Sequence, residues 1–306
     1  MDKIDRELLQ RVADLHKVPT GSFNIRKNGE AIARGSTKDI EIVPKKNKSG
    51  IDIIVKDGVK NKSVHIPVIL TLGGFSDLVY NDFYIGKDCD VTIIAGCGIH
   101  NKTCKDSQHD GIHSFHVGEN SKVRYVEKHY GAGEGSGKKI LNPITKIVMK
   151  KGSSMEFESI QIGGVSSTVR KTYAKLQDNC VLNIKENILT TDEQYAKTYF
   201  KVELLGENSK CDVVSHSVAE GHSYQEFISD MIGKNKSFGH VECDGILMDE
   251  GRIVSVPKID AISKDASLVH EAAIGKIAGD QLIKLMSLGL SQEEAEKTII
   301  KGFLYN

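Results

Sequence analysis

The chain has 306 residues, enough to bury one large hydrophobic core or two smaller ones. Its 41 basic and 41 acidic residues balance, so no overall electrostatic field attracts nucleic acid or an anionic membrane. The N-terminus MDKIDRELLQRVADLHK is charged throughout, unlike a signal peptide, and no apolar run approaches the roughly 20 residues of a membrane span. Six scattered cysteines without a C-x-x-C pair predict free thiols in a soluble, cytoplasmic protein.

The first predicted element is a helix over about residues 3 to 16. Ile4, Leu8, Val12 and Leu15 recur there at helical spacing. A short polar stretch, VPTGSFNIRKNGE, ends this helix. We therefore expect residues 1–40 to form an N-terminal helical segment.

Residues 41–260 have a different character, because short runs rich in Val, Ile, Thr and Tyr alternate with polar turns. A strand-turn-strand pattern keeps returning, and the pentapeptide GENSK occurs at both 118 and 206. The turn positions 86, 118, 152, 178, 206 and 233 are separated by 32, 34, 26, 28 and 27 residues. This spacing predicts a mainly β solenoid, a right-handed parallel β-helix, whose stacked units share one core. The turn glycines would take positive φ. A β-sandwich is the alternative.

Residues 261–306 are predicted to be a C-terminal helical region. The first helix, about 280–288, places apolar residues on one side: Leu282, Leu285 and Met286. Ser291 and Glu294 form a capping box before a second helix, in which Ala295, Ile299 and Phe303 share a face. Such helices either cap the open end of a solenoid or form a docking surface for a partner.

One cysteine lies between two acidic residues in HVECDG, at 240–245. Strand alternation would point Cys243 toward the core and Glu242 and Asp244 away from it, and the carboxylates would raise the pKa of the thiol. A buried core cysteine and a ligand are both compatible with this pattern. His270 and Glu271 are adjacent; either side chain can ligate iron or zinc, but the pair is also common at the solvated start of a helix.

A third cluster falls within AGCGIHNKTCKDSQHDGIHSFH. Its candidate metal ligands are Cys97, His100, Cys104, His109, His113 and His116. Because the spacings C-x2-H and C-x6-C match no common zinc site, a polar loop between strands, with Cys97 partly exposed, is the simpler interpretation. The chain has no P-loop motif and no G-x-S-x-G motif, so it is not itself a P-loop nucleotide hydrolase.

The C-terminal part resembles a known family. The runs GHVECDGILMDEGRIVSVPKIDA and LVHEAAIGKIAGDQLIKLMSLGLSQEEAEKTIIKGFL resemble the end of the SufB/SufD iron-sulfur cluster assembly scaffolds. The resemblance is strong over about 200–306, weaker over 80–200 and poor before residue 40. It implies a parallel β-helix with helical ends, a second scaffold subunit, and a SufC-type ABC ATPase that binds the C-terminal helices. The docking residues would be Leu282, Leu285, Met286, Ile299 and Phe303.

The resemblance also implies roles for particular residues. Cys243 matches the interface cysteine of the SufB type, a candidate cluster ligand, and His270 and Glu271 match the interface residues of the HEA motif. Cys97 falls where SufB-like chains carry Gly-Cys, the position proposed to receive sulfur. The family's following T-A-P is replaced here by G-I-H, which puts that role in doubt.

The resulting hypothesis is a minimal scaffold, not an enzyme, that transiently holds an iron-sulfur cluster of undefined type. It would be a homodimer, or a heterodimer with a SufD-like chain, and would work with SufC, a sulfur donor and recipient apoproteins. One alternative is an adaptor that activates SufC and carries no cluster. A polysaccharide lyase or hydrolase on the same fold is disfavoured, because the chain has no Trp and only 6% aromatic residues.

Overall fold

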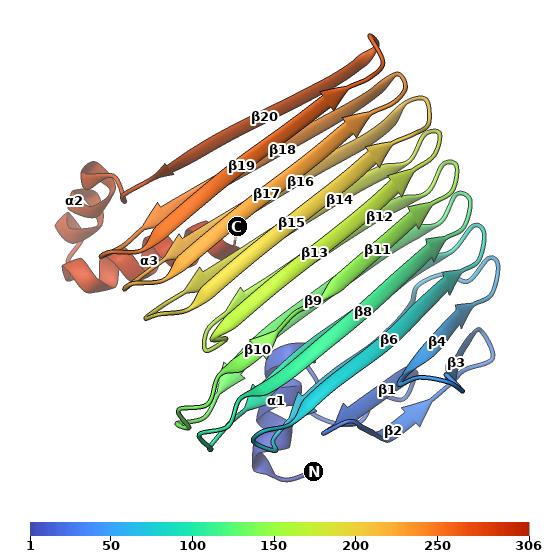
Figure 1. Cartoon of the computed structure of the whole chain (residues 1–306), viewed down its shortest axis with the longest axis horizontal. Coiled ribbons are helices and arrows are strands. Elements are labelled where there is room, and N and C mark those ends of the chain that lie inside the picture. Colours follow the sequence, from blue (N-terminus) through green and yellow to red (C-terminus); the bar gives the residue numbers. More distant parts are fainter. Residues whose placement is uncertain (306) are drawn as a thin grey trace.

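The computed structural model describes residues 1–305 as a parallel β-solenoid with helices near both ends (Figure 1). Two ten-stranded sheets face each other, and most successive strands along the chain alternate between the two sheets. In order along the first sheet, sheet A, the strands are β2 (Glu30–Gly35), β1 (Ser22–Lys27), β5 (Lys62–Leu70), β7 (Asp90–His100), β9 (Lys122–Ala132), β12 (Ser154–Ile162), β14 (Val181–Thr190), β16 (Ser209–Ala219), β18 (Ser237–Leu247) and β20 (Ala266–Gly275).

Sheet B forms the opposite wall of the solenoid. Its strands, again in spatial order, are β19 (Arg252–Ala261), β17 (Tyr224–Gly233), β15 (Tyr195–Leu204), β13 (Ser167–Leu176), β10 (Lys139–Leu141), β8 (Ser107–Val117), β6 (Ser76–Ile85), β4 (Gly50–Val55) and β3 (Ile40–Pro44). A further strand, β11 (Ile144–Met149), follows β10 and also lies between β8 and β13. The predicted parallel β-solenoid is therefore confirmed.

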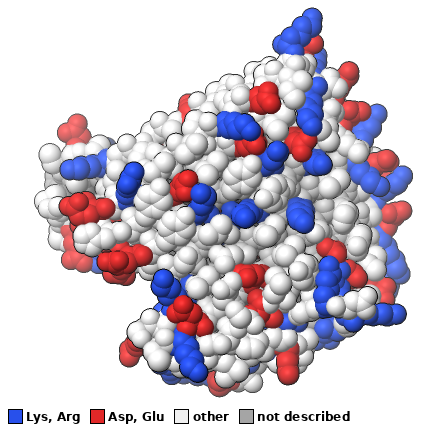
Figure 2. Space-filling view, viewed as in Figure 1, with Lys and Arg blue, Asp and Glu red and all other residues white. Residues whose placement is uncertain are grey.

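The core runs along the interior between the sheets. Inward residues alternate with outward ones along each strand. Because neighbouring strands are in register, similar side chains stack on one another from coil to coil. Phe83 and Phe115, paired in register on β6 and β8, stack with ring centroids 4.2 Å apart, and Tyr125 and Phe157 continue the aromatic row across sheet A. On the face shown in Figure 2, basic and acidic residues are interspersed, in agreement with the zero net charge.

The repeated turns confirm the predicted positive φ at Gly152 but differ from the prediction in the two GENSK turns. In both GENSK turns the residue with positive φ is the asparagine, Asn120 or Asn208, while the glycines Gly118 and Gly206 have ordinary φ. Asn tolerates the left-handed region, because its short side chain can form local hydrogen bonds. The glycines serve close stacking instead: a Cβ on Gly118 would lie 2.3 Å from a carbonyl oxygen of the neighbouring turn.

The N-terminal end of the solenoid is closed. Antiparallel pairs β1–β2 and β3–β4 terminate the two sheets, and α1 (Lys3–Ala13) packs against sheet A across β5, β7 and β9. This helix lies close over two glycines of β7: a Cβ on Gly96 would lie 2.3 Å from the carbonyl oxygen of Val12, and one on Gly98 would lie 3.1 Å from the side chain of Leu8. Strands β1 and β2 thus lie within residues 1–40, where the sequence predicts only a helical segment.

The C-terminal end of the solenoid is open. No strand within residues 1–305 pairs with the outer edge of β19 or β20. Strand β20 belongs to the region predicted to be helical, and the helices α2 (Gly279–Ser287) and α3 (Gln292–Tyr305) follow it. Helix α3 lies against sheet A at β14 and β16, beside the open end (Figure 1).

Candidate functional site

Cys243 lies on β18 and faces the solenoid interior. Its side chain is fully buried, whereas Glu242 and Asp244 point outward, so the predicted alternation is confirmed. Burial is the main cause that raises the pKa of the Cys243 thiol to about 11, and the nearby Ser255 opposes the shift. In the isolated chain Cys243 is therefore a protonated thiol at neutral pH, and a bound metal would be needed to stabilise the thiolate.

His270 faces the same interior from the last strand. On β20 it lies opposite Val241, while Cys243 lies opposite Ala272, two residues further along. Both ring nitrogens of His270 are buried and have no hydrogen-bond partner among residues 1–305. Burial, followed by the nearby His240, lowers the pKa of His270, so its imidazole is neutral and offers a free lone pair. Cys243 and His270 thus share one inner surface at the open end.

Glu271 points to the opposite face of sheet A. It lies beside Glu242 on the exterior and accepts a hydrogen bond from Nε2 of His240 at 2.7 Å. Nδ1 of His240 contacts Asp212, also at 2.7 Å, and the hydrogen bonds to these two carboxylates raise the pKa of His240. The structure therefore brings Cys243 and His270 to one face and places Glu271 on the other.

Cys97 is a buried strand residue, so the predicted polar loop with a partly exposed Cys97 is wrong. It lies on β7 with 2% exposure, and only the connection around the exposed Cys104 is a loop. The strand forms because its apolar residues pair with β5 and β9 on either side. The thiol borders a small cavity whose polar lining is Asn81, His109, His113, Glu127 and His129. Burial, followed by Asp77 and Glu127, raises the pKa of Cys97 well above its usual range.

Of the other members of this cysteine-histidine cluster, His109 and His113 line the same cavity as Cys97, while His100, Cys104 and His116 lie elsewhere. His109 and His113 point inward from β8, while His116 points outward and stacks on Tyr84 with ring centroids 5.0 Å apart. His100 ends β7, away from both. Among residues 1–305, no group of three of these side chains has ligand atoms close enough to share a metal ion.

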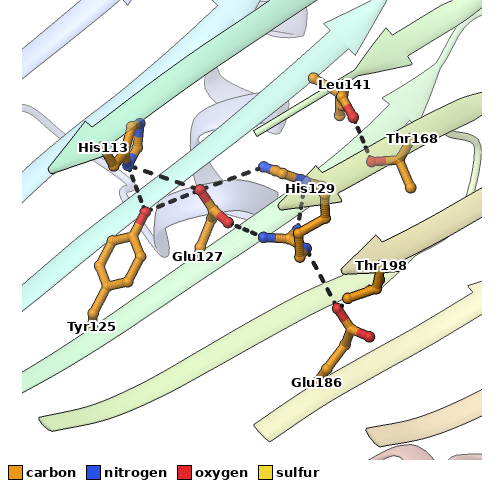
Figure 3. A network of polar contacts seen from close by, with 9 residues as sticks. His113, Tyr125, Glu127, His129, Leu141, Thr168, Glu186 and Thr198 are labelled. Atoms are coloured by element: carbon orange, nitrogen blue, oxygen red, sulfur yellow. Dashed lines mark hydrogen bonds and ion pairs between the residues drawn. The ribbon is translucent and has the colours of Figure 1, made fainter. Parts of the chain in front are cut away.

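A chain of buried polar contacts begins at the Cys97 cavity (Figure 3). Nδ1 of His113 contacts the hydroxyl of Tyr125 at 2.7 Å, and this hydroxyl donates to Glu127. The guanidinium of Arg170 pairs with Glu127 and lies 3.1 Å from Nδ1 of His129. Although burial opposes ionisation, Arg170 is the main group that lowers the pKa of Glu127 to about 2. The centre of the solenoid therefore holds a buried ion pair.

The same polar chain continues toward Cys243. Arg170 lies 3.5 Å from Glu186, which accepts hydrogen bonds from Thr198 at 3.0 Å and from Ser215 at 3.3 Å. Ser215 on β16 is the register partner of Cys243 on β18. Burial raises the pKa of Glu186. The guanidinium of Arg170 therefore lies beside two different carboxyl groups: Glu127, whose pKa is lowered, and Glu186, which keeps its proton to a higher pH than usual. The interior between Cys97 and Cys243 is consequently polar at several successive strands.

These features coincide with a known family. A family model described as "SUF system FeS cluster assembly, SufBD core domain" matches residues 82–303. The chain belongs to the SufBD family. The matched SufBD core includes Cys97, Cys243, His270 and Glu271, and nearly the whole of α3.

Three archaeal SufBD proteins illustrate the range of similarity. An iron-sulfur cluster assembly SufBD family protein of Pyrococcus horikoshii is 27% identical over 301 residues, covering 96% of this chain and 84% of the relative. A SufBD family protein of Methanocaldococcus jannaschii is 27% identical over 258 residues, covering 82% and 79%. One from Archaeoglobus fulgidus is 28% identical over 228 residues; the match covers 74% of this chain and 60% of that protein.

The predicted docking residues of this SufBD protein have unequal exposure. None of the residues of α2 is buried: Leu282 and Leu285 are half-buried and Met286 is 43% exposed. Two further apolar side chains nearby, Ile283 and Leu288, are 66% and 76% exposed. In contrast, α3 lies on the chain's own sheet A. Its Ile299 is half-buried, and the ring of Phe303 lies 4.7 Å from that of His216.

Sequence reasoning missed the buried ion pair. The available signal was a charged residue at an inward position of β9. Val123 and Tyr125 face the core, and alternation then places Glu127 there as well.

No helix formed by residues 1–305 combines the length and the apolar character needed to cross a lipid bilayer.

Proposed function

We propose that this SufBD protein is a scaffold on which an iron-sulfur cluster is built at the open end of the solenoid, with Cys243 and His270 as ligands. Thiolate and imidazole are suitable ligands for iron, and clusters are held mainly by cysteine. The family membership supports the assembly role. Free cysteines throughout the chain are consistent with work in the reducing cytoplasm.

The observation that carries this proposal is the state of His270. It is a neutral imidazole whose two buried nitrogens have no hydrogen-bond partner among residues 1–305, and it faces the same interior as Cys243 from the last strand of sheet A. An unsatisfied buried polar group costs roughly 1–3 kcal/mol. A ligand at this position would remove that cost, and iron binding would lower the pKa of Cys243 from the high value set by burial.

A second subunit would complete the site. The free edges of β19 and β20 carry unpaired backbone groups, and apolar side chains are exposed along them: Val256, Ile259, Val269 and Ile274. Two copies meeting across a two-fold axis would cover these edges and bring two sets of Cys243 and His270 together. We infer a homodimer, with a heterodimer containing a SufD-like chain as the other arrangement. Glu271, on the exterior, would reach the cluster only if the interface rearranged its strand.

Cys97 is proposed to receive sulfur from a donor. In such a transfer the sulfane sulfur leaves the donor persulfide and bonds to Cys97, and the donor departs as a thiol, so no electrons are gained or lost overall. The burial of Cys97 would shelter the persulfide from solvent. The polar chain through Arg170 and Glu186 supports a connection between this cysteine and Cys243.

The ATPase partner is proposed to bind α2. Exposed apolar side chains on a short helix near the cluster site favour docking of a SufC-type ABC ATPase there, with α3 contributing through Ile299 and Phe303. ATP-driven movement of the two scaffold subunits would open the interface and release the cluster to an apoprotein.

The decisive experiment compares two buried cysteines. The chain would be co-expressed with a SufC-type ATPase and purified without oxygen, and iron, sulfide and the visible spectrum measured for the wild type, Cys243→Ala and Cys211→Ala. Cys211 is a matched control, because it also faces the core, one strand away on β16. We expect Cys243→Ala to lose the cluster and Cys211→Ala to keep it. Equal cluster content in all three would favour the adaptor function, in which ATPase stimulation needs no cluster.

A further inference from the structure

Three potential metal ligands meet on the exterior of sheet A near the open end. His216 on β16 lies opposite Asp244 on β18, and Glu242 is two residues before Asp244 on the same face. One ligand atom from each side chain can be chosen such that all three lie within 4.8 Å of one another. Within residues 1–305 this is the only such group of three His, Cys, Asp or Glu side chains.

Residues 1–305 satisfy the polar atoms of these three side chains only in part. Nδ1 of His216 is buried and has no hydrogen-bond partner within residues 1–305. Across the same residues, neither Glu242 nor Asp244 forms an ion pair. Asp244 accepts a hydrogen bond from the backbone N–H of Ala273 at 3.2 Å, and its carboxyl group lies within hydrogen-bonding reach of that of Glu242. Two adjacent carboxyl groups and an imidazole nitrogen that has no hydrogen-bond partner among residues 1–305 therefore lie together on this face.

Nearby His240 shows what a satisfied imidazole looks like on the same surface. It lies between Asp212 and Glu271, with 2.7 Å contacts on both ring nitrogens. His216, by comparison, is held by packing, because the ring of Phe303 from α3 lies against it at 4.7 Å with an interplanar angle of 32°. This packing orients the imidazole, and its Nδ1 has no hydrogen-bond partner among residues 1–305.

We propose that His216, Glu242 and Asp244 bind a divalent first-row metal ion, which is iron(II) in the cell. One imidazole nitrogen and carboxylate oxygens form a ligand set that suits iron(II), manganese(II) or zinc(II) and disfavours copper(I), which prefers sulfur. The choice of iron rests on the proposed scaffold function, whereas the cation site itself does not. Because Glu242 and Asp244 flank Cys243 on one strand, the site would hold iron on the outer side of the strand that carries the inward thiol.

The test is a metal titration of the complete chain without its partner. Metal-free protein would be titrated without oxygen by calorimetry with Fe²⁺, and with Co²⁺ as a visible absorption probe. We expect one bound ion per chain with a cobalt spectrum that lacks thiolate charge-transfer bands. Glu242→Gln and Asp244→Asn should each weaken binding by about tenfold or more, since loss of even an outer partner of a metal ligand costs that much. His216→Asn should do the same.

Matched controls come from other exterior positions. His116→Asn removes another outward imidazole that stacks on an aromatic ring, and Glu158→Gln removes a carboxylate of sheet A that pairs with Arg124. Both variants should bind metal like the wild type. Circular dichroism and thermal unfolding would show that each variant is folded; Glu242→Gln keeps the test valid if His216→Asn disturbs the packing of α3.

Two results would overturn the inference. One is the absence of binding tighter than about millimolar in the wild type; the other is metal binding that survives Glu242→Gln and Asp244→Asn but is lost in Cys243→Ala. The outcomes separate this site from the proposed function. A chain that binds the ion through Glu242 but forms no cluster with its ATPase would contradict the scaffold proposal and leave the metal site intact.

Discussion

Arg170 offers the sharpest test of the buried polar chain. Its side chain is 1% exposed and pairs with Glu127, whose carboxylate has a pKa of about 2. Arg170→Met removes the guanidinium and leaves that carboxylate buried without a cation. Breaking a buried ion pair on one side costs about 3–5 kcal/mol. We therefore expect the free energy of unfolding to fall by about 4 kcal/mol at pH 7.

Companion variants separate charge from shape. Arg170→Lys keeps the positive charge but loses the planar fork that reaches both Glu127 and His129, and it should cost about 1–2 kcal/mol. The double variant Arg170→Met/Glu127→Gln removes both charges and should recover at least about half of the loss, because neutral replacement of a buried pair is often tolerated.

The pH dependence gives the sign of the effect. The folded-state pKa of Glu127 is depressed from 4.5 to about 2, so its ionised form contributes stability above pH 4.5 that is lost as the pH falls toward 2. The difference between wild type and Arg170→Met should shrink over that range. Urea unfolding followed by circular dichroism measures all of these quantities. A loss below about 1 kcal/mol for Arg170→Met, or a double variant whose loss equals the sum of the singles, would refute the reasoning.

Three further predictions concern protonation, thiol access and docking. Burial lowers the pKa of His113 from 6.5 to about 4 and that of His129 from 6.5 to about 3. Below pH 6.5 the unfolded chain therefore binds more protons than the folded chain. The free energy of unfolding should fall by about 4 kcal/mol as the pH is lowered from 7.5 to 5. Iodoacetamide should modify the exposed Cys104 at least about tenfold faster than the buried Cys97, as read by peptide mass spectrometry. Leu288→Lys should weaken binding to a SufC-type ATPase by about tenfold without changing the melting temperature, since Leu288 is 76% exposed.

Each of these predictions has a contradicting result. A free energy of unfolding that is constant from pH 7.5 to 5 would mean that the two histidines are not held neutral. Equal labelling rates for Cys97 and Cys104 would show that the β7 region opens readily. Unchanged ATPase binding by the Leu288 variant, measured by calorimetry, would move the docking surface away from the end of α2.

The repeat signals in the sequence predicted the solenoid because the same local chemistry recurs at each turn. GENSK contains both a residue that tolerates positive φ and a glycine that allows the turns to stack, although the sequence alone led us to assign the first role to the wrong residue. The inward direction of Cys243 followed from alternation on an unmistakable strand. Where turns and side-chain alternation were regular in the sequence, the folded structure agreed with the conformations that those local sequences favour.

The arrangement of the candidate ligands was harder to predict. The stretch HEAAIGKIAG is rich in alanine, a strong helix former, yet its first half forms β20 because pairing with β18 outweighs local propensity. Once residues 270 and 271 belong to a strand, adjacent side chains face opposite sides, so His270 and Glu271 lie on opposite faces of sheet A in this structure. The contacts among His216, Glu242 and Asp244 depend on the register between strands 28 residues apart, which the sequence does not specify.

The open end of the solenoid has a consequence for local stability. In a stack of coils, each coil is stabilised mainly by its two neighbours, so the last coil, with β19 and β20, has about half the support of an interior one. Its amide hydrogens should exchange with solvent earlier than those of β14 or β16, through openings that leave the rest of the stack folded. His270, a proposed cluster ligand, thus lies in the coil that can be loosened at least cost, and the other ligand, Cys243, lies on the neighbouring strand. A partner that covers this end would slow amide exchange there.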